Sequence, residues 1–367
     1  MSFTRLAPTD FVVSSDSITA PAWSSNQPTL RTFFTGSPVV STGISQGAFY
    51  LNVFQTGSTA NGAAVQFALA YGNIVGSGSR WYNPLVPGVS PSLTTYRQYE
   101  TLVYGPALSG SVQGFNFGGA ATSAPDIFVI NVDRNRYKES LFPGTFNLSI
   151  SGSVGGIQLT DNSNDVTTVT YLDCGRVFDL VSGSFGNAST ATPTNAIAPG
   201  YTPSGSYGFF LPDIGCIILN ASALALGTVY GGIGLPLDRQ NYGSGSYTLN
   251  ASASYTSTNN TILFAAISSS ATASANCGFQ LNSQETISSD YIFVRVGNAD
   301  YNYSSNPTFV TGSGNVLYST MIYSPQTYIT TVGLYNDNSE LLAVAKMSRP
   351  LVKDFTKEAL IRVKLDW

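Results

Sequence analysis

The 367-residue chain contains no histidine. Histidine is the commonest general base, the commonest activator of serine and cysteine nucleophiles, and the commonest metal ligand. Its absence excludes Ser-His-Asp and Cys-His catalysis. Charged residues are also scarce, at 10% of the chain, whereas soluble domains carry about 25%. We therefore expect no enzymatic activity, and a surface whose polarity comes mainly from Ser, Thr and Asn.

Cysteine is almost as scarce, and Cys174, Cys216 and Cys277 lie far apart in the chain. Their odd number and wide spacing favour free structural thiols over a disulfide framework. No two of them have the spacing of a structural zinc site. We expect neither a metal nor a cofactor.

One segment has part of a calcium-binding pattern. Residues 161–165, with the sequence DNSND, place oxygen ligands at alternate positions, as a calcium loop does. However, Val166 stands where that loop needs glycine, and Leu172 stands where its bidentate acid belongs. We expect a polar turn. Paired carboxylates for glycoside hydrolysis cannot be recognised from spacing alone, because the two acids come from separate strands in β folds.

The sequence also lacks features for binding nucleic acids, phosphates or membranes. The net charge is −4, and no basic cluster interleaved with aromatic residues is present. The glycine-rich segments 76–79 and 243–246 lack the Lys-Ser/Thr of a phosphate loop, so we expect turns. The first residues show no basic and then apolar leader, and no apolar run approaches about 18 residues. We expect no nucleic acid partner and no membrane insertion.

The residues that are abundant favour strands. Ser, Thr, Asn, Tyr and Gly predict an all-β protein of two or three antiparallel β-sandwich-like domains, with long Gly/Ser/Pro loops, little helix and no long helices. Apolar and polar residues alternate over 49–53 and 65–71. The Asn61-Gly62 pair between them predicts an antiparallel hairpin. Proline-rich residues 83–91 predict an ordered loop.

Two neighbouring segments have opposite characters. Residues 127–132 form a nearly continuous apolar run of strand length, which predicts a strand covered on both faces. Residues 133–139 form a cluster of mixed charge beside the Pro143-Gly144 turn, which favours a solvated corner over a binding site. A further strand is expected over 145–150.

The middle of the chain is poor in charge. Between 181 and 283, only Asp213, Asp238 and Arg239 are charged, yet apolar clusters occur that could close a core. We therefore expect a second β-rich domain or insertion, partly covered by another subunit. The predicted domains are 1–155, 156–285 and 286–367.

The C-terminal part has a different pattern. Residues 328–332 and 341–345 predict a hairpin, which we expect Pro350 to end. Residues 361–367 alternate strictly between apolar and charged side chains, and a strand this regular must be paired. We hypothesise that residues 346–367 dock on a neighbouring subunit, by strand addition or as a clamp. The candidate interface residues are Lys346, Arg349, Lys353, Arg362, Lys364 and Trp367.

Several segments resemble a known class of proteins. They are residues 10–23, 133–144, 328–337 and 341–346, together with 208–215. These segments resemble virion structural proteins of large contractile-tailed phages, especially those that infect cyanobacteria and other aquatic bacteria. The resemblance implies a non-enzymatic tail component, in the baseplate or its periphery. It also implies partners among other virion proteins, in multiple copies, and a place in the virion after assembly in the host cytoplasm.

Three alternatives stay open at this point. The chain contains 21 tyrosines, whose rings could stack on sugars, so a receptor-binding or fibre-associated module for host surface glycans is the first. Tyrosine is, however, also common in strands and at subunit contacts. A capsid decoration protein is the second alternative, and a depolymerase is the third.

Overall fold

The computed structural model describes residues 4–35, 50–74, 76, 92–106, 114–117, 123–189, 207–228, 231–237, 255–273, 278–304 and 306–366. The chain divides into two compact units, which we describe separately. The central unit comprises Ile18–Glu285. The terminal unit comprises Met1–Ser17 together with Thr286–Trp367.

This division differs from the three domains expected from the sequence. The residues on either side of position 155 belong to one sheet, because β8 (Asn147–Ser151) pairs with β9 (Gly156–Asp161). The first 17 residues group instead with the C-terminal residues. The boundary at position 155 and the placement of the first 17 residues both depend on strand pairing between distant segments. Local composition does not reveal such pairing.

The all-β class predicted from composition is confirmed, with 45% strand, 17% helix and large antiparallel sheets. The central unit contains one 13-stranded sheet, in the order β2-β15-β8-β9-β11-β13-β14-β6-β5-β4-β3, with β10 and β12 attached to β11. Its remaining strands are β2 (Thr29–Leu30), β3 (Phe34–Thr35), β4 (Tyr50–Phe54), β5 (Val65–Asn73), β6 (Asp126–Val132), β10 (Thr170–Leu172), β11 (Gly175–Ser184), β12 (Asn187–Ala188), β13 (Gly208–Leu211), β14 (Cys216–Asn220) and β15 (Phe279–Gln280). A short strand, β7 (Ser140–Leu141), pairs with β16 (Asn282–Val296).

Hydrophobic side chains fill both faces of this sheet. Successive residues of a strand point to opposite faces. In β6, Phe128 and Ile130 therefore belong to one buried cluster, while Ile127 and Val129 belong to another. The prediction that residues 127–132 form a strand covered on both faces is confirmed.

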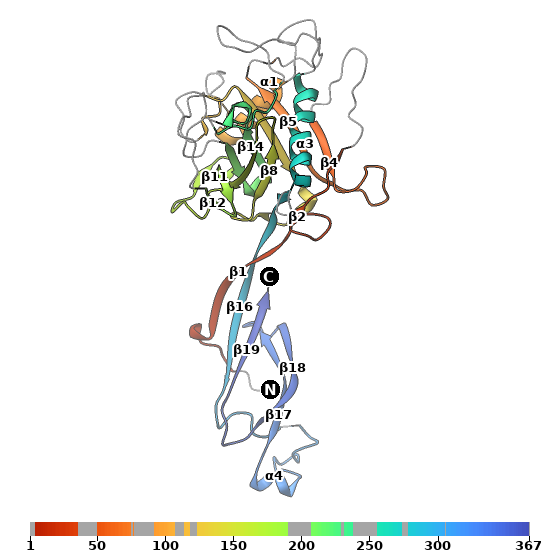
Figure 1. Cartoon of the computed structure of the whole chain (residues 1–367). Coiled ribbons are helices and arrows are strands. Elements are labelled where there is room, and N and C mark those ends of the chain that lie inside the picture. Colours follow the sequence, from red (N-terminus) through yellow and green to blue (C-terminus); the bar gives the residue numbers. More distant parts are fainter. Residues whose placement is uncertain are drawn as a thin grey trace. The chain divides into compact units, whose positions relative to one another are not determined.

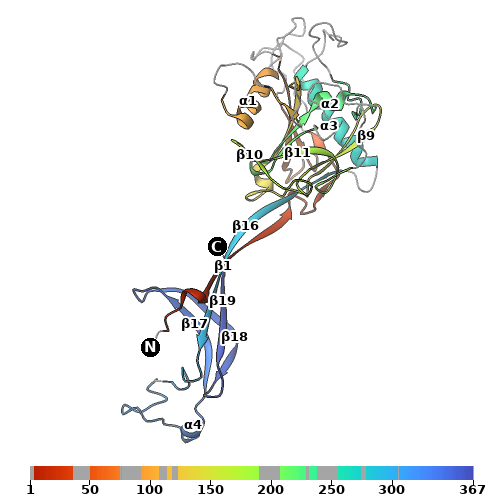
Figure 2. The ribbon, with the colours of Figure 1, turned by 90° about the vertical axis from the view of Figure 1, so that its left-hand side faces the viewer.

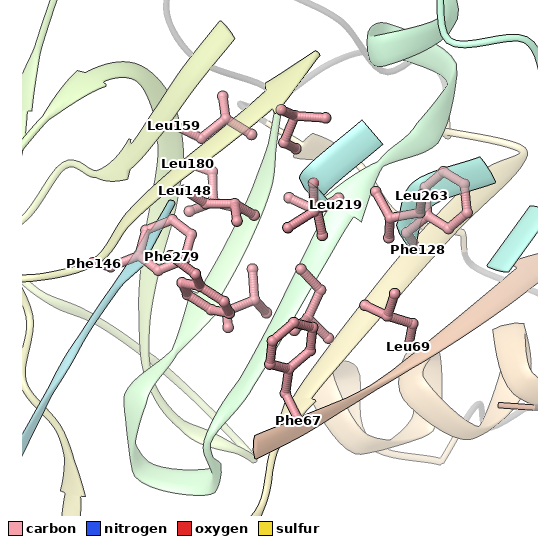
Figure 3. Close-up of a cluster of buried hydrophobic side chains, with 14 of the residues drawn as sticks. Phe67, Leu69, Phe128, Phe146, Leu148, Leu159, Leu180, Leu219, Leu263 and Phe279 are labelled. Carbon is pink, nitrogen blue, oxygen red and sulfur yellow. The ribbon is translucent and has the colours of Figure 1, made fainter. Parts of the chain in front are cut away.

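The sheet curls around the larger cluster. Phe67 on β5 and Phe279 on β15 are far apart in the strand order, yet their ring centroids are 5.2 Å apart. Trp23 packs against the same Phe279 ring at 4.8 Å. Figure 3 shows Phe67 and Phe279 in this core with Leu148, Leu219 and other aliphatic side chains between the strands.

Two helices cover the two faces. Tyr96, Tyr99 and Val103 of α1 (Ser92–Tyr104) pack in one cluster, and Leu263 and Ile267 of α3 (Tyr255–Ala273) pack in the other. Figure 2 shows α1 and α3 on opposite sides of the strands. A third helix, α2 (Ala221–Ala225), is short. None of the described helices is long and apolar enough to cross a membrane.

The expectation of no long helix is wrong at α3, which has 19 residues. Its sequence is rich in Ser, Thr and Ala, and these residues do not by themselves predict a helix of this length. Leu263, Ala266, Ile267 and Ser270 are buried at the spacing of one helix face. Packing of this face on the sheet therefore stabilises α3, as is usual for helices in proteins.

The local predictions in the first half of the chain are confirmed where the structure describes them. The strands β4 and β5 form an antiparallel hairpin, and Gly62 in its turn has a φ of 81°. In the 133–139 corner, Arg134 is exposed and donates to the Tyr137 carbonyl at 2.7 Å. The strand expected over 145–150 is β8. The expected loop over 83–91 and the glycine-rich segment 243–246 lie outside the described residues, as does most of the segment 76–79.

The terminal unit contains two small sheets (Figure 1). The first has the order β1-β16-β19, and the second is the hairpin of β17 and β18. Ile292 of β16, Leu334 of β17 and Val363 of β19 share one small buried cluster. The two sheets therefore pack through this cluster. The remaining elements are β1 (Phe11–Pro21), β17 (Thr327–Tyr335), β18 (Leu341–Lys353), β19 (Ala359–Asp366) and α4 (Ser319–Tyr323).

The predicted C-terminal hairpin and the pairing of the last strand are confirmed. The strands β17 and β18 pair antiparallel, and β19 pairs antiparallel with β16. The prediction that Pro350 ends the hairpin strand is wrong, because β18 continues to Lys353. Its register shifts so that Thr331 faces Lys346 while Ile329 faces Leu351. Pro350 lies in this bulge, where a missing N–H breaks no ladder.

Candidate interaction surface

The buried polar groups of the central unit hold its own strands and loops together. Asp126 at the start of β6 accepts hydrogen bonds from Tyr71 and Asn73, both at 2.5 Å, and from Ser222 at 3.3 Å. Glu100 of α1 accepts from the Gly114 amide at 2.6 Å. In the described part of the chain, no three His, Cys, Asp or Glu residues are grouped to hold a metal ion.

The 161–165 segment forms the expected polar turn, and its oxygens bind backbone amides. Asp161 accepts from the Gly144 amide at 2.8 Å, and Asp165 accepts from the Ala188 amide at 2.7 Å. Between them, Asn162 accepts from the amide of Asp179 at 3.0 Å. Burial raises the pKa of Asp161 above its ordinary value. The side-chain oxygens of this turn therefore connect the sheet to its loops.

An ion pair holds the segment 208–215. Asp213 lies in the turn between β13 and β14, and Arg176 on β11 donates to its Oδ1 from Nη2 at 2.6 Å and from Nε at 2.9 Å. Burial raises the pKa of Asp213, but the hydrogen bonds and charge of Arg176 outweigh this and hold the pKa below its ordinary value. This ion pair connects β11 to the turn that follows β13.

The cysteines that the structure describes are buried. Cys174 and Cys216 are free thiols, and burial raises the pKa of both. A raised pKa lowers the thiolate fraction, so these thiols have the low reactivity of structural cysteines. Cys277 lies outside the described residues.

Four of the six candidate interface residues are exposed, namely Lys346, Arg349, Arg362 and Lys364. Trp367 lies outside the described residues. Lys353 was assigned wrongly to the surface, because its exposed fraction is 0%. Its ammonium donates to the Asn302 side-chain oxygen at 2.7 Å and to the carbonyls of Asn298 and Asp354 at 3.0 and 2.9 Å. Lys353 thus fixes a loop of its own unit.

Two of the exposed cations share one aromatic ring. The guanidinium of Arg362 lies 5.5 Å from the Tyr291 ring centroid, and the ammonium of Lys364 lies 5.9 Å from it. Lys364 also pairs with Asp366 at 2.9 Å, and Ser289 donates to Asp366 at 2.7 Å. Such exposed pairs contribute little stability. They form a polar, mainly basic face on β16 and β19.

Exposed apolar side chains are concentrated in the terminal unit. Of the 24 large hydrophobic residues that are exposed in the described part of the chain, 17 belong to this unit. Of the 53 hydrophobic residues that are buried there, only four belong to it. A 99-residue unit with so few buried side chains exposes much of the apolar surface that would normally form its core.

The first part of this surface is the outer face of the β17–β18 hairpin. Leu334 points into the small buried cluster, so Gly333 and Tyr335 beside it point outward. Val344 lies opposite Gly333 in the register, and the neighbouring Leu342 is also exposed. We call the exposed side chains Tyr335, Leu341, Leu342 and Val344 the hairpin patch.

The second part lies around α4, at the end of the hairpin (Figures 1 and 2). Tyr323 has an exposed fraction of 93%, and Tyr318 and Ile322 are also exposed. Tyr301 and Tyr303, on the preceding loop, are exposed as well. We call these five residues the tyrosine tip.

The third part is β1, which the sequence analysis missed as a strand. Phe11, Val12 and Val13 are consecutive and all exposed. Consecutive strand residues point to opposite faces, so both faces of β1 are apolar and uncovered. The β-branched residues between Asp10 and Pro21 were the available signal. No alternation accompanied them, because neither face is buried.

Neither a protein-family model nor a curated protein nor a solved structure matches the chain.

Proposed function

We propose that the protein is a non-enzymatic structural component of a tailed-phage virion, in the tail baseplate or its periphery, and that it acts through contacts between subunits. The observation that carries this proposal is the apolar surface of the terminal unit. Large exposed apolar patches mark interaction sites on soluble proteins. The segments that resemble virion proteins of contractile-tailed phages support the same function.

Antibodies against the chain test this proposal on intact particles. Purified virions are labelled and imaged by electron microscopy, and the labels are expected at the tail end. Labels on the head would favour the capsid decoration protein. Absence of the chain from particles, with the protein present in the host lysate, would refute the structural function altogether.

A surface substitution tests whether the hairpin patch makes the contact. We expect Val344→Glu to reduce incorporation of the chain into particles, because it places a charge in an apolar interface. Val154→Glu is the matched control, since Val154 of the central unit has a similar exposed fraction, 54% against 58%. Equal incorporation of both variants would exclude the hairpin patch as the contact.

A second candidate function is recognition of host surface glycans, and the tyrosine tip favours it. Exposed aromatic rings offer the flat apolar faces on which sugars stack. Binding of the full chain to purified host envelope polysaccharide is the direct test. Tyr323→Ala should abolish this binding, whereas Tyr171→Ala should not, because Tyr171 is 69% exposed but lies in the central unit. Absence of binding by the unaltered chain would remove this candidate.

A further inference from the structure

The terminal unit lacks the core that its size requires. Ordering each residue costs about 1–2 kcal/mol of backbone entropy, which burial of apolar surface must offset. Small units that cannot bury enough surface gain stability from disulfides, metals or association. This unit contains no cysteine, and its described residues hold no metal-ligand group. Of these three sources of stability, association with another molecule is the one that remains for this unit.

A molecule that covers the exposed apolar surface of β1 must contact both faces and the open edge of this strand. Phe11, Val12 and Val13 expose apolar side chains on both faces of β1. In the described part of the chain, β1 and β19 each pair with β16 alone, so the outer edges of β1 and β19 are open; the fourth strand of this sheet, β7, also pairs with β16. Open edges with apolar faces readily pair with another strand. A partner strand added to the sheet, with its own side chains packing beside it, would cover these features.

The two open edges carry complementary charges. Asp16 is the only charged residue of β1, whereas β19 carries Arg362 and Lys364 before Asp366. The pKa of Lys364 is raised first by its hydrogen bond to Asp366, and the charge of Asp16 adds to this. One edge is acidic, and the other is mainly basic.

We infer that the terminal unit binds a second copy of the same chain, with the β19 edge of one copy pairing with the β1 edge of the next. Each chain offers both complementary edges, and its own copies are present whenever it folds. An interface between two different edges is heterologous, and such an interface closes into a ring when the rotation permits. The inference deepens the proposed structural function, because it names the partner in one of the subunit contacts.

Light scattering of the purified full chain is the first test. We expect a discrete oligomer whose melting temperature rises with protein concentration, as mass action requires of an interface needed for folding. A monomer with a cooperative, concentration-independent transition would overturn the inference. Oligomers found in solution but absent from virions would refute the proposed function alone, and monomers found in virions would refute the inference alone.

Cysteine cross-linking identifies the edges. Val12→Cys, Ser14→Cys or Asp16→Cys in one tagged copy is co-expressed with Arg362→Cys or Lys364→Cys in another. Side chains of directly opposite residues lie about 4.5–5.5 Å apart, so at least one of the six combinations should form a disulfide between copies. Cross-linking by Lys364→Cys alone would indicate pairing of identical edges and overturn the proposed arrangement. An oligomer without cross-links in any combination would also overturn it.

Two controls keep this test independent of folding. Val154→Cys, in the central unit, gives the background of cross-linking by an exposed position. The unaltered chain gives the background from its own three cysteines. Each cysteine variant is used only where light scattering shows the same oligomer as the unaltered chain, so a failure to fold cannot imitate a failure to cross-link.

Discussion

The two units of this protein use similar residues in opposite ways. The central unit buries Phe, Leu, Ile and Val on both faces of one sheet and covers those faces with α1 and α3. The terminal unit has strands of comparable length, but among its described residues 17 large apolar side chains are exposed and only four hydrophobic residues are buried. Burial makes the first unit a scaffold with its own core. The second unit presents apolar surface that its own described residues do not cover.

The largest effect is expected in the core of the central unit. The ring centroid of Phe67 lies 6.1 Å from those of Trp23 and Phe33, and 5.2 Å from that of Phe279. Phe67→Ala should lower the free energy of unfolding by about 3–5 kcal/mol through lost contacts and a cavity. Urea denaturation followed by tryptophan fluorescence measures this. Phe34→Ala, at an exposed position of the same unit, is the control. A loss below about 1 kcal/mol for Phe67→Ala would contradict the conclusion that the central unit is stabilised by its own tightly packed core.

Lys353 offers the corresponding test of the terminal unit. Methionine matches its length but donates no hydrogen bonds, so Lys353→Met leaves three acceptors without this donor. Each buried group left unpaired costs about 1–3 kcal/mol, and we expect a total loss near 3 kcal/mol. Hydrogen exchange should increase in residues 298–304 and not in the central unit. Lys346→Met, exposed on the same strand, should change nothing measurable. Increased exchange in both units would indicate that Lys353 stabilises more than its own unit.

Sequence reasoning found the elements that are built from neighbouring residues. The β4–β5 hairpin is encoded by alternation and by Asn61-Gly62, and β6 is encoded by its continuous apolar run. The β17–β18 hairpin and the two faces of β19 follow from patterns of the same kind. In each case the signal and the structure occupy the same short segment, so local chemistry was sufficient.

The features that were missed depend on distant residues. Lys353 looks like part of a solvated charged segment until Asn298 and Asn302, some 50 positions away, supply its acceptors. The helix α3 depends on the sheet that its apolar face covers. Leu342 and Val344 of the hairpin patch could not be distinguished from core residues, because alternation shows that a face is apolar but not that anything covers it.

A glycine in the central unit tests how tightly its helix packs. A Cβ atom on Gly72 of β5 would lie 2.9 Å from the backbone nitrogen of Tyr96 in α1, closer than real contacts allow. Gly72→Ala should therefore cost about 2 kcal/mol, as overpacking typically does. Gly57→Ala is the matched control, since its Cβ would meet nothing within 4 Å. Thermal melting of both variants measures the difference, and equal melting temperatures would show that α1 can shift away from the sheet.

The smallest expected effect is the pH dependence of the Arg176–Asp213 pair. The folded pKa of Asp213 is held below its ordinary value, so this carboxylate stabilises the fold fully above the unfolded pKa of about 4. The contribution is lost as the pH falls through the folded pKa. Because both side chains are partly exposed, we expect Asp213→Asn to cost only about 1 kcal/mol at neutral pH.

This difference between the unaltered chain and Asp213→Asn should stay constant from neutral pH to about pH 5 and shrink below about pH 4. The raised pKa values of Asp161 and Asp179 act in the opposite direction, because these groups favour the fold more as they become protonated. Comparing the two proteins at each pH cancels that contribution. Urea denaturation between pH 3 and 7 measures the difference. A difference that grows toward acid pH would mean that the Arg176 side chain does not hold the charged form of Asp213.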